Sequence, residues 1–144
     1  MEYAAVAPLF DRLIDDDLDE SLDVKQKRFL SFDELQESIM ENLSNLLNTR
    51  VSLSWQTNVS KVVAPYAYGV STKISISPDN VADIRELECN IDKAIRDFEP
   101  RLIDAHSHVI GIGEPAGTLS ITIDAVVAYK NHHSLLSFPI VITL

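Results

Sequence analysis

DFEPRLIDAHSHVIGIG, residues 97–113, divides the chain into a helical part and a strand-forming part. Proline lacks a backbone N–H and disfavours the α conformation in the residue before it. Pro100 therefore predicts that a helix ends at Glu99 and that an extended segment begins at Arg101. Apolar and polar residues alternate beyond this corner, which places Ile103, Ala105 and Val109 on one face of a strand and Asp104, His106 and His108 on the other.

Two amphipathic helices are predicted before the corner, because apolar residues recur at steps of three and four. The earlier helix opens with Ser31 three residues before Glu34, the spacing of a capping box, and we expect it to end near Asn48. The later helix is predicted from about Asp79 to Phe98. The two apolar stripes are Phe32, Leu35, Ile39, Leu43, Leu46 and Leu47 in the earlier helix, and Val81, Ile84, Leu87, Ile91, Ile95 and Phe98 in the later one.

Two more strands are predicted beyond the corner, because residues 115–144 are dense in Ile, Val, Leu and Thr and carry only Asp124 and Lys130 as charges. A polar turn at residues 130–134 joins these strands, which predicts an antiparallel meander. The fold class is therefore α+β, with two main helices packed on a small antiparallel sheet and an acidic N-terminal arm. The apolar faces of the two strands are Leu119, Ile121, Ile123, Val127 and Tyr129, and Leu136, Phe138, Ile140, Ile142 and Leu144.

Pro139 lies in the middle of the last predicted strand. Because proline cannot donate to a strand ladder, its nitrogen is expected to face an open edge of the sheet. An open edge can accept a strand from another chain. We therefore expect the strand that carries Phe138, Ile140 and Ile142 to bind a partner.

Residues 1–30 are interpreted as an anchor and an acidic linker, and residues 31–144 as one α+β domain. The anchor is a short apolar patch, too small for a core of its own, and five acids follow it between residues 15 and 20. Residues 50–76 predict an extended loop with one short strand. Residues 72–77, TKISIS, are either an edge strand or an approach to the second helix. Trp55 is expected either in the core or as an interface anchor.

Composition excludes several classes of protein. The chain of 144 residues has the length of one domain, and its 22 acidic and 12 basic residues give a net charge of −10. That charge disfavours nucleic acids and anionic membranes as partners. Cys89 is the single cysteine, which fits a reducing compartment and excludes an intramolecular disulfide. Since we see neither a secretory signal nor a run of membrane-spanning length, we expect a soluble cytoplasmic protein.

The sequence gives no clear place for catalysis. Asp104, His106 and His108 could hold zinc together, but the spacing is weak evidence and we expect no metal. A glycoside hydrolase needs two carboxyl groups, one of them protonated, and Glu99 could act with Asp97 or Asp104. Arg101 favours the ionised form of a neighbouring carboxyl, which is the opposite of what a general acid needs. We see no catalytic triad, phosphate loop or nucleotide fingerprint, and predict no catalytic residue and no cofactor.

Four segments in order, LFDRL (9–13), SIMENLSNLLNTR (38–50), YGV (68–70) and IDKAIRDFEPRL (91–102), carry a family resemblance. Together they resemble TssE, the baseplate wedge component of type VI secretion systems, which is related to the small wedge protein of contractile phage tails. FEPRL is the most specific element. The chain departs from the family after Tyr-Gly, where a Leu-Pro-Asp-like turn is common and this sequence has Val70, Ser71 and Thr72.

The resemblance implies a non-catalytic scaffold in a baseplate docked at the inner membrane. It implies as partners the wedge proteins TssF, TssG and TssK and the sheath proteins TssB and TssC, the latter through strand exchange. It also implies that Glu99, Pro100 and Arg101 are the functional triplet. We expect this corner to aim its acid and base outward at partners.

Three alternatives remain at this point. The ion pair could only brace the domain's own helix against its own sheet. The protein could be a peptidoglycan hydrolase that uses Glu99, although the lysozyme name given to the family looks inherited from a neighbouring domain in phage proteins. It could also be an unrelated module that binds partners through a strand edge.

Overall fold

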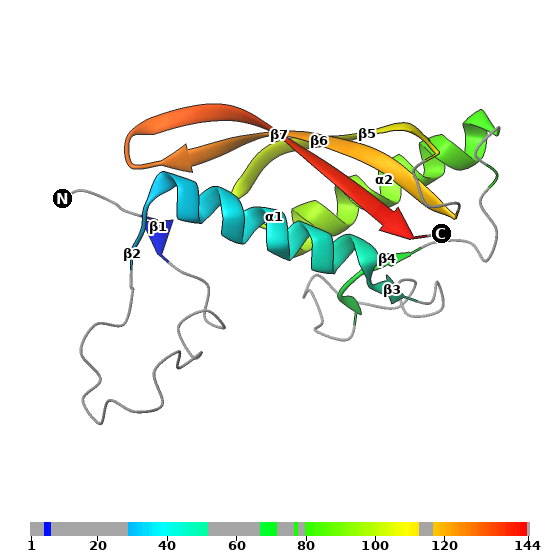
Figure 1. Cartoon of the computed structure of the whole chain (residues 1–144), viewed down its shortest axis with the longest axis horizontal. Coiled ribbons are helices and arrows are strands. Elements are labelled where there is room, and N and C mark those ends of the chain that lie inside the picture. The colour runs from blue at the N-terminus through cyan, green and yellow to red at the C-terminus, as the bar shows by residue number, and fades with distance from the viewer. Residues whose placement is uncertain are drawn as a thin grey trace, which may run out of the picture.

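The structure, a computed structural model, describes residues 5–6, 29–51, 67–71, 77, 80–112 and 117–143. Two long helices, α1 (Phe32–Asn48) and α2 (Val81–Phe98), cover one face of a three-stranded antiparallel sheet (Figure 1). The sheet has the order β5 (Leu102–Ile112), β6 (Thr118–Tyr129) and β7 (His132–Thr143). The predicted α+β fold of two helices on a small antiparallel sheet is confirmed.

Two pairs of very short strands accompany this core. β1 (Ala5–Val6) pairs antiparallel with β2 (Phe29–Leu30), and β3 (Arg50–Val51) pairs parallel with β4 (Val70–Ser71). The sequence predicted one short strand between residues 50 and 76 and none before residue 31. The predicted anchor, the acidic run, Trp55 and residues 72–76 lie outside the described residues.

Helix α1 begins with the predicted capping box. The Ser31 hydroxyl accepts a hydrogen bond from the Glu34 backbone N–H at 3.3 Å, and the Ser31 N–H donates to the Glu34 carboxylate at 2.8 Å. Each bond satisfies a backbone donor that the helix itself leaves unpaired. Five members of the predicted stripe are buried, namely Leu35, Ile39, Leu43, Leu46 and Leu47.

Helix α2 begins two residues later than predicted. Asn80 is its N-cap and accepts from the Ala82 N–H at 3.0 Å, so Val81 is the first helical residue. Val81 is 65% exposed, and its place in the predicted apolar stripe is wrong. A residue in the first turn of a helix has fewer neighbours than one in its middle, which explains the difference. None of the helices in the described part of the chain has the length and apolar content needed to span a bilayer.

The core lies between the two helices and the inner face of the sheet. β6, the central strand, buries every second residue, as its predicted apolar face requires. Burial of each large apolar side chain contributes about 1.5–3 kcal/mol to folding. The buried apolar residues of the sheet are Leu102, Leu119, Ile121, Ile123, Ala125, Val127, Phe138, Ile140 and Ile142.

A bulge in β5 changes which residues face the core. Asp104 has a φ of 49°, and the register with β6 shifts between Ile103 and His106. The extra residue reverses the alternation, so Leu102 is buried while Ile103 is 39% exposed. The predicted inward position of Ile103 is therefore wrong, whereas Ala105 packs against the core as expected.

The turn between β6 and β7 is shorter than predicted. Tyr129 pairs directly with His132, so only Lys130 and Asn131 form the turn. Lys130 has a φ of 53°, which lets the chain reverse within two residues. His132 and His133, predicted in a turn, are instead the first two residues of β7.

Candidate functional site

The predicted corner lies between α2 and β5. Glu99 is the C-cap of α2, where its backbone N–H donates to the Ile95 carbonyl at 2.8 Å. Its own carbonyl accepts from the Leu102 N–H at 3.2 Å and closes a turn through the exposed Pro100. β5 then begins at Leu102, so the predicted change from helix to strand at this proline is confirmed.

Glu99 and Arg101 form a forked ion pair within this turn. Arg101 Nε donates to Glu99 Oε1 and Arg101 Nη2 donates to Glu99 Oε2, each at 2.6 Å. The side chain of Glu99 is 5% exposed and that of Arg101 is 20% exposed. Charge-assisted bonds of this kind are short and directional, and a planar guanidinium can make two of them to one carboxylate.

The ion pair is turned towards α1. Arg101 Nη1 also donates to the Ser38 hydroxyl at 3.1 Å, which links the corner to the first helix. The expected outward orientation of both charges is therefore wrong for Glu99, which lies almost fully inside its own domain. Of the triplet, Pro100 is exposed and Arg101 is partly so. The pair is thus engaged inside its own domain, although its contact beyond the turn is to α1 and not to the sheet, and a partner role for the triplet stays a prediction.

Tyr68, a residue of the YGV segment for which no role was predicted, lies beside the corner. Its ring meets the Phe98 ring edge-on, with centroids 5.3 Å apart and planes at 75°. Burial raises the pKa of the Tyr68 phenol, and the negative charge of Glu99 raises it further. The phenol is thus kept neutral beside the carboxylate.

Gly69 lets the chain beside Tyr68 approach the end of α1. Its φ is +126°, and a Cβ at this position would lie 2.5 Å from the Thr49 carbonyl oxygen. Next to it, the Val70 N–H donates to that same oxygen at 2.8 Å. Only glycine combines this backbone conformation with so close an approach.

Three of the four segments that carry the family resemblance therefore meet along α1. Residues 38–50 contribute Ser38 and Thr49, residues 68–70 contribute Tyr68 and Gly69, and residues 91–102 contribute the corner. The fourth segment, residues 9–13, lies outside the described residues. Segments far apart in the sequence are thus joined along one helix.

The predicted partner strand has its apolar side chains inside. Phe138, Ile140 and Ile142 are 3%, 5% and 4% exposed, because they pack on the inner face of the sheet under the helices. The apolar face predicted for this strand is therefore buried as expected, and partner binding by the strand stays a prediction. What β7 can offer is its backbone edge.

One end of that edge is already covered by α1 and β3. The Thr143 N–H donates to Asn48 Oδ1 at 3.2 Å, and the Arg50 guanidinium donates to the Thr143 carbonyl. The Asn48 amide also lies 3.5 Å from the Val141 carbonyl. Since bonding directions alternate along an antiparallel strand, Pro139 points its nitrogen to the same side, as its missing N–H predicted.

The opposite edge of the sheet is covered by α2. Ser107 N–H donates to Asp92 Oδ1 at 2.8 Å, and Val109 N–H donates to Glu88 Oε1 at 2.9 Å. These two N–H groups point away from β6, and the helix carboxylates satisfy them. On β7, the contacts from Asn48 and Arg50 are at residues 141–143, and none of the described residues bonds to the outward backbone groups of residues 135–139.

Comparison with known proteins now gives the family. The model of the family described as baseplate wedge protein gp25 matches residues 33–132. This chain belongs to the gp25 baseplate wedge family. Members of that family are components of phage-tail-like baseplates, so the resemblance found in the sequence is confirmed at the level of the family.

A solved structure and the curated proteins add little to this assignment. The structure of a provisionally named tail lysozyme from Geobacter sulfurreducens is similar, with a TM-score of 0.46 and 21% sequence identity. The similarity covers 80% of this chain and 97% of that one. No curated protein matches the sequence.

The geometry of this gp25-family protein gives little support to the two alternatives of a hydrolase that uses Glu99 and of a zinc site at Asp104, His106 and His108. Both carboxylate oxygens of Glu99 accept bonds from Arg101, so neither is directed at a substrate. Among the described residues, no three His, Cys, Asp or Glu side chains are grouped as metal ligands. His106 Nδ1 lies 4.0 Å from Asp92 Oδ2, and Asp104 is held in the bulge.

Proposed function

We propose that this protein is the TssE-like wedge component of a type VI secretion baseplate. It is a non-catalytic scaffold that joins TssF, TssG and TssK and contacts the first layer of the sheath formed by TssB and TssC. It works in the cytoplasm, in a baseplate docked at the inner membrane. The gp25 family match and the order of the four resembling segments support this proposal.

The observation that carries the proposal is the internal position of the Glu99–Arg101 pair. The pair joins the end of α2 to Ser38 of α1, and so holds the surface around Pro100 in one shape. Glu99 and Arg101 therefore act as positioning residues, and the wedge partners contact the exposed surface that they support. A surface that is rigid before binding loses less conformational entropy on association.

Sheath contact is assigned to the open part of β7. A strand from a sheath protein would pair with the backbone of residues 135–139, because helix carboxylates already occupy Ser107 and Val109 on the β5 edge and Asn48 occupies the end of the β7 edge. Main-chain bonds would supply the attraction, and Phe138 would remain in the core.

Two substitutions test the role of the corner. Arg101→Ala leaves the Glu99 carboxylate buried without its partner, so both stability and co-purification of TssF and TssG should fall. Pro100→Ala leaves the ion pair intact, so stability should stay within about 1 kcal/mol of the parent while wedge binding weakens. Unchanged co-purification by both variants would contradict a role of this corner in assembly.

Incubation with peptidoglycan tests the non-catalytic part of the proposal. The purified protein should release no reducing sugar. Release that disappears in Glu99→Gln would establish a hydrolase and overturn the scaffold assignment.

A further inference from the structure

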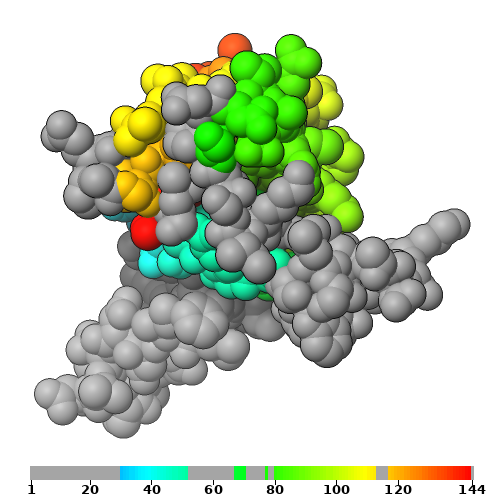
Figure 2. Space-filling model, turned by 90° about the vertical axis from the view of Figure 1, so that its right-hand side faces the viewer, coloured from blue at the N-terminus to red at the C-terminus, as the bar shows by residue number. Residues whose placement is uncertain are grey.

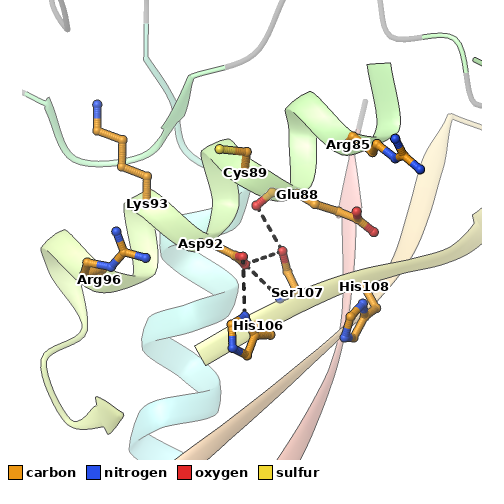
Figure 3. Close-up of a pocket in the computed structure, with 9 residues that line it drawn as sticks. All are labelled: Arg85, Glu88, Cys89, Asp92, Lys93, Arg96, His106, Ser107 and His108. Carbon is orange, nitrogen blue, oxygen red and sulfur yellow. Dashed lines mark hydrogen bonds and ion pairs between the residues drawn. The ribbon is translucent and has the colours of Figure 1, made fainter. Parts of the chain in front are cut away.

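A groove with a cavity volume of about 500 Å³ lies between α2 and β5 and reaches from Arg85 to Arg96, in the last turn of the helix (Figure 3). Its helical wall carries three cations, Arg85, Lys93 and Arg96. Its strand wall carries the exposed His106 and His108. Figure 3 shows Arg85 near one end of the groove and Lys93 and Arg96 near the other.

The two acids of the groove are occupied by the strand. Asp92 Oδ1 accepts from the Ser107 N–H at 2.8 Å and lies 2.6 Å from the Ser107 hydroxyl. Glu88 Oε1 accepts from the Val109 N–H at 2.9 Å. These bonds fix the distance between the walls and direct both carboxylates towards β5. The groove is therefore formed before any ligand arrives.

The three cations, in contrast, have no hydrogen bond or ion pair in the described part of the chain. The other described lysines and arginines do have contacts: Arg50 with Thr143, Arg101 with Glu99, and Lys130 with the Tyr129 ring. The described cations without such a contact therefore all lie on one helix, α2, although the protein as a whole has a net charge of −10. In the side view of Figure 2, α2 lies at the surface of the molecule, above α1.

The spacing of these cations indicates the shape of the ligand. Arg85 and Arg96 are eleven positions apart, which is about 16 Å along a helix. A single phosphate cannot reach both, whereas about five residues of extended peptide span that length. A nucleic acid is disfavoured, because the groove has no Phe, Tyr or Trp for base stacking and the whole protein is acidic.

We propose that this groove binds an extended acidic segment of another protein chain. The carboxylates of that segment pair with Arg85 at one end and with Lys93 and Arg96 at the other, and the imidazole N–H groups of His106 and His108 offer further donors. The lining of the groove includes no residue of the Glu99–Arg101 corner and none of β7, so the proposal does not depend on the baseplate assignment.

The test is an NMR titration of the full chain with a capped six-residue peptide of alternating Glu and Asp, at low salt. Amide shifts are expected around residues 85–96 and 106–108. The variant Arg85→Gln/Lys93→Gln/Arg96→Gln should bind about tenfold more weakly, since each exposed ion pair contributes only a few tenths of a kcal/mol to 1 kcal/mol. Lys130→Gln, another exposed cation removed from the groove, should bind as the parent does.

Two controls make the result decisive. A peptide of alternating Gln and Asn should give no shifts, and 0.5 M NaCl should remove those of the acidic peptide. Far-ultraviolet circular dichroism checks that the triple variant is folded, which is expected because all three side chains are exposed. Equal binding by parent and triple variant, equal binding of the neutral peptide, or no binding at all would overturn the proposal.

Discussion

Arg101 donates to Ser38 across 63 residues of sequence, at 3.1 Å, from the same guanidinium that holds Glu99. This contact joins the turn after α2 to the middle of α1. The corner is therefore a junction between three parts of the chain, the two helices and the first strand of the sheet. A partner that binds near Pro100 meets a surface whose shape depends on that junction.

Arg101→Ala is predicted to destabilise the fold by about 2–4 kcal/mol, because it leaves a buried carboxylate unpaired. Urea unfolding measures the loss. Ser38→Ala, which removes only the bond from Arg101 to α1, should cost about 1 kcal/mol. Equal losses for the two variants would mean that the Glu99 contact contributes little.

Gly69→Ala is predicted to cost about 2–4 kcal/mol, since the backbone conformation is strained for alanine and the new methyl group meets the Thr49 carbonyl. Gly111 is the matched control. A Cβ there meets nothing within 4 Å, so Gly111→Ala should stay within about 0.5 kcal/mol of the parent. Similar melting temperatures for the two variants would contradict the close approach to α1.

We predict that the ionisation of Tyr68 lowers the stability of the fold at high pH. Its folded-state pKa is raised above the ordinary value of 10.0, so the folded protein holds this proton more tightly than the unfolded chain does. Its contribution to stability is complete below pH 10.0 and is lost as the pH rises through the higher folded-state pKa. Tyr68→Phe should therefore lose less stability than the parent over that range in parallel melts. Identical pH profiles would show that the phenol does not titrate differently on folding.

Asp92→Ala is predicted to uncover the outer edge of β5, because Asp92 accepts from the Ser107 N–H. The Ser107 amide should exchange its hydrogen faster, by about tenfold for each 1.4 kcal/mol of lost local stability. Asp97, exposed on the same helix, gives a control, and Asp97→Ala should leave that rate unchanged. An exchange rate of the Ser107 amide that is the same in Asp92→Ala as in the parent would contradict the hydrogen bond from the Ser107 N–H to Asp92.

Local signals in the sequence predicted much of this fold. Ser31 with Glu34, and Pro100 after an apolar stripe, act on neighbouring backbone groups, so they place the start of α1 and the end of α2 without knowledge of the rest. The position of Ile103 could not be predicted in this way. It depends on a bulge at Asp104, which is set by pairing with β6 and not by the alternation of residue types.

The sequence could not predict whether the Glu99 and Arg101 side chains point outward or inward, for a similar reason. A proline corner can aim its flanking side chains outward or inward, and the choice depends on Ser38 and on the packing of α1 against α2. Likewise, the alternation in β7 predicted a buried face correctly, but Asn48 and Arg50 decide which part of its edge remains open.

The most direct measurement of the central claim is affinity purification of the tagged protein from its native cells, with mass spectrometry of what it retains. The scaffold account predicts that TssF- and TssG-like wedge proteins are recovered with the parent and depleted with Arg101→Ala. Recovery without any baseplate component would contradict the account, as would equal recovery by the two proteins.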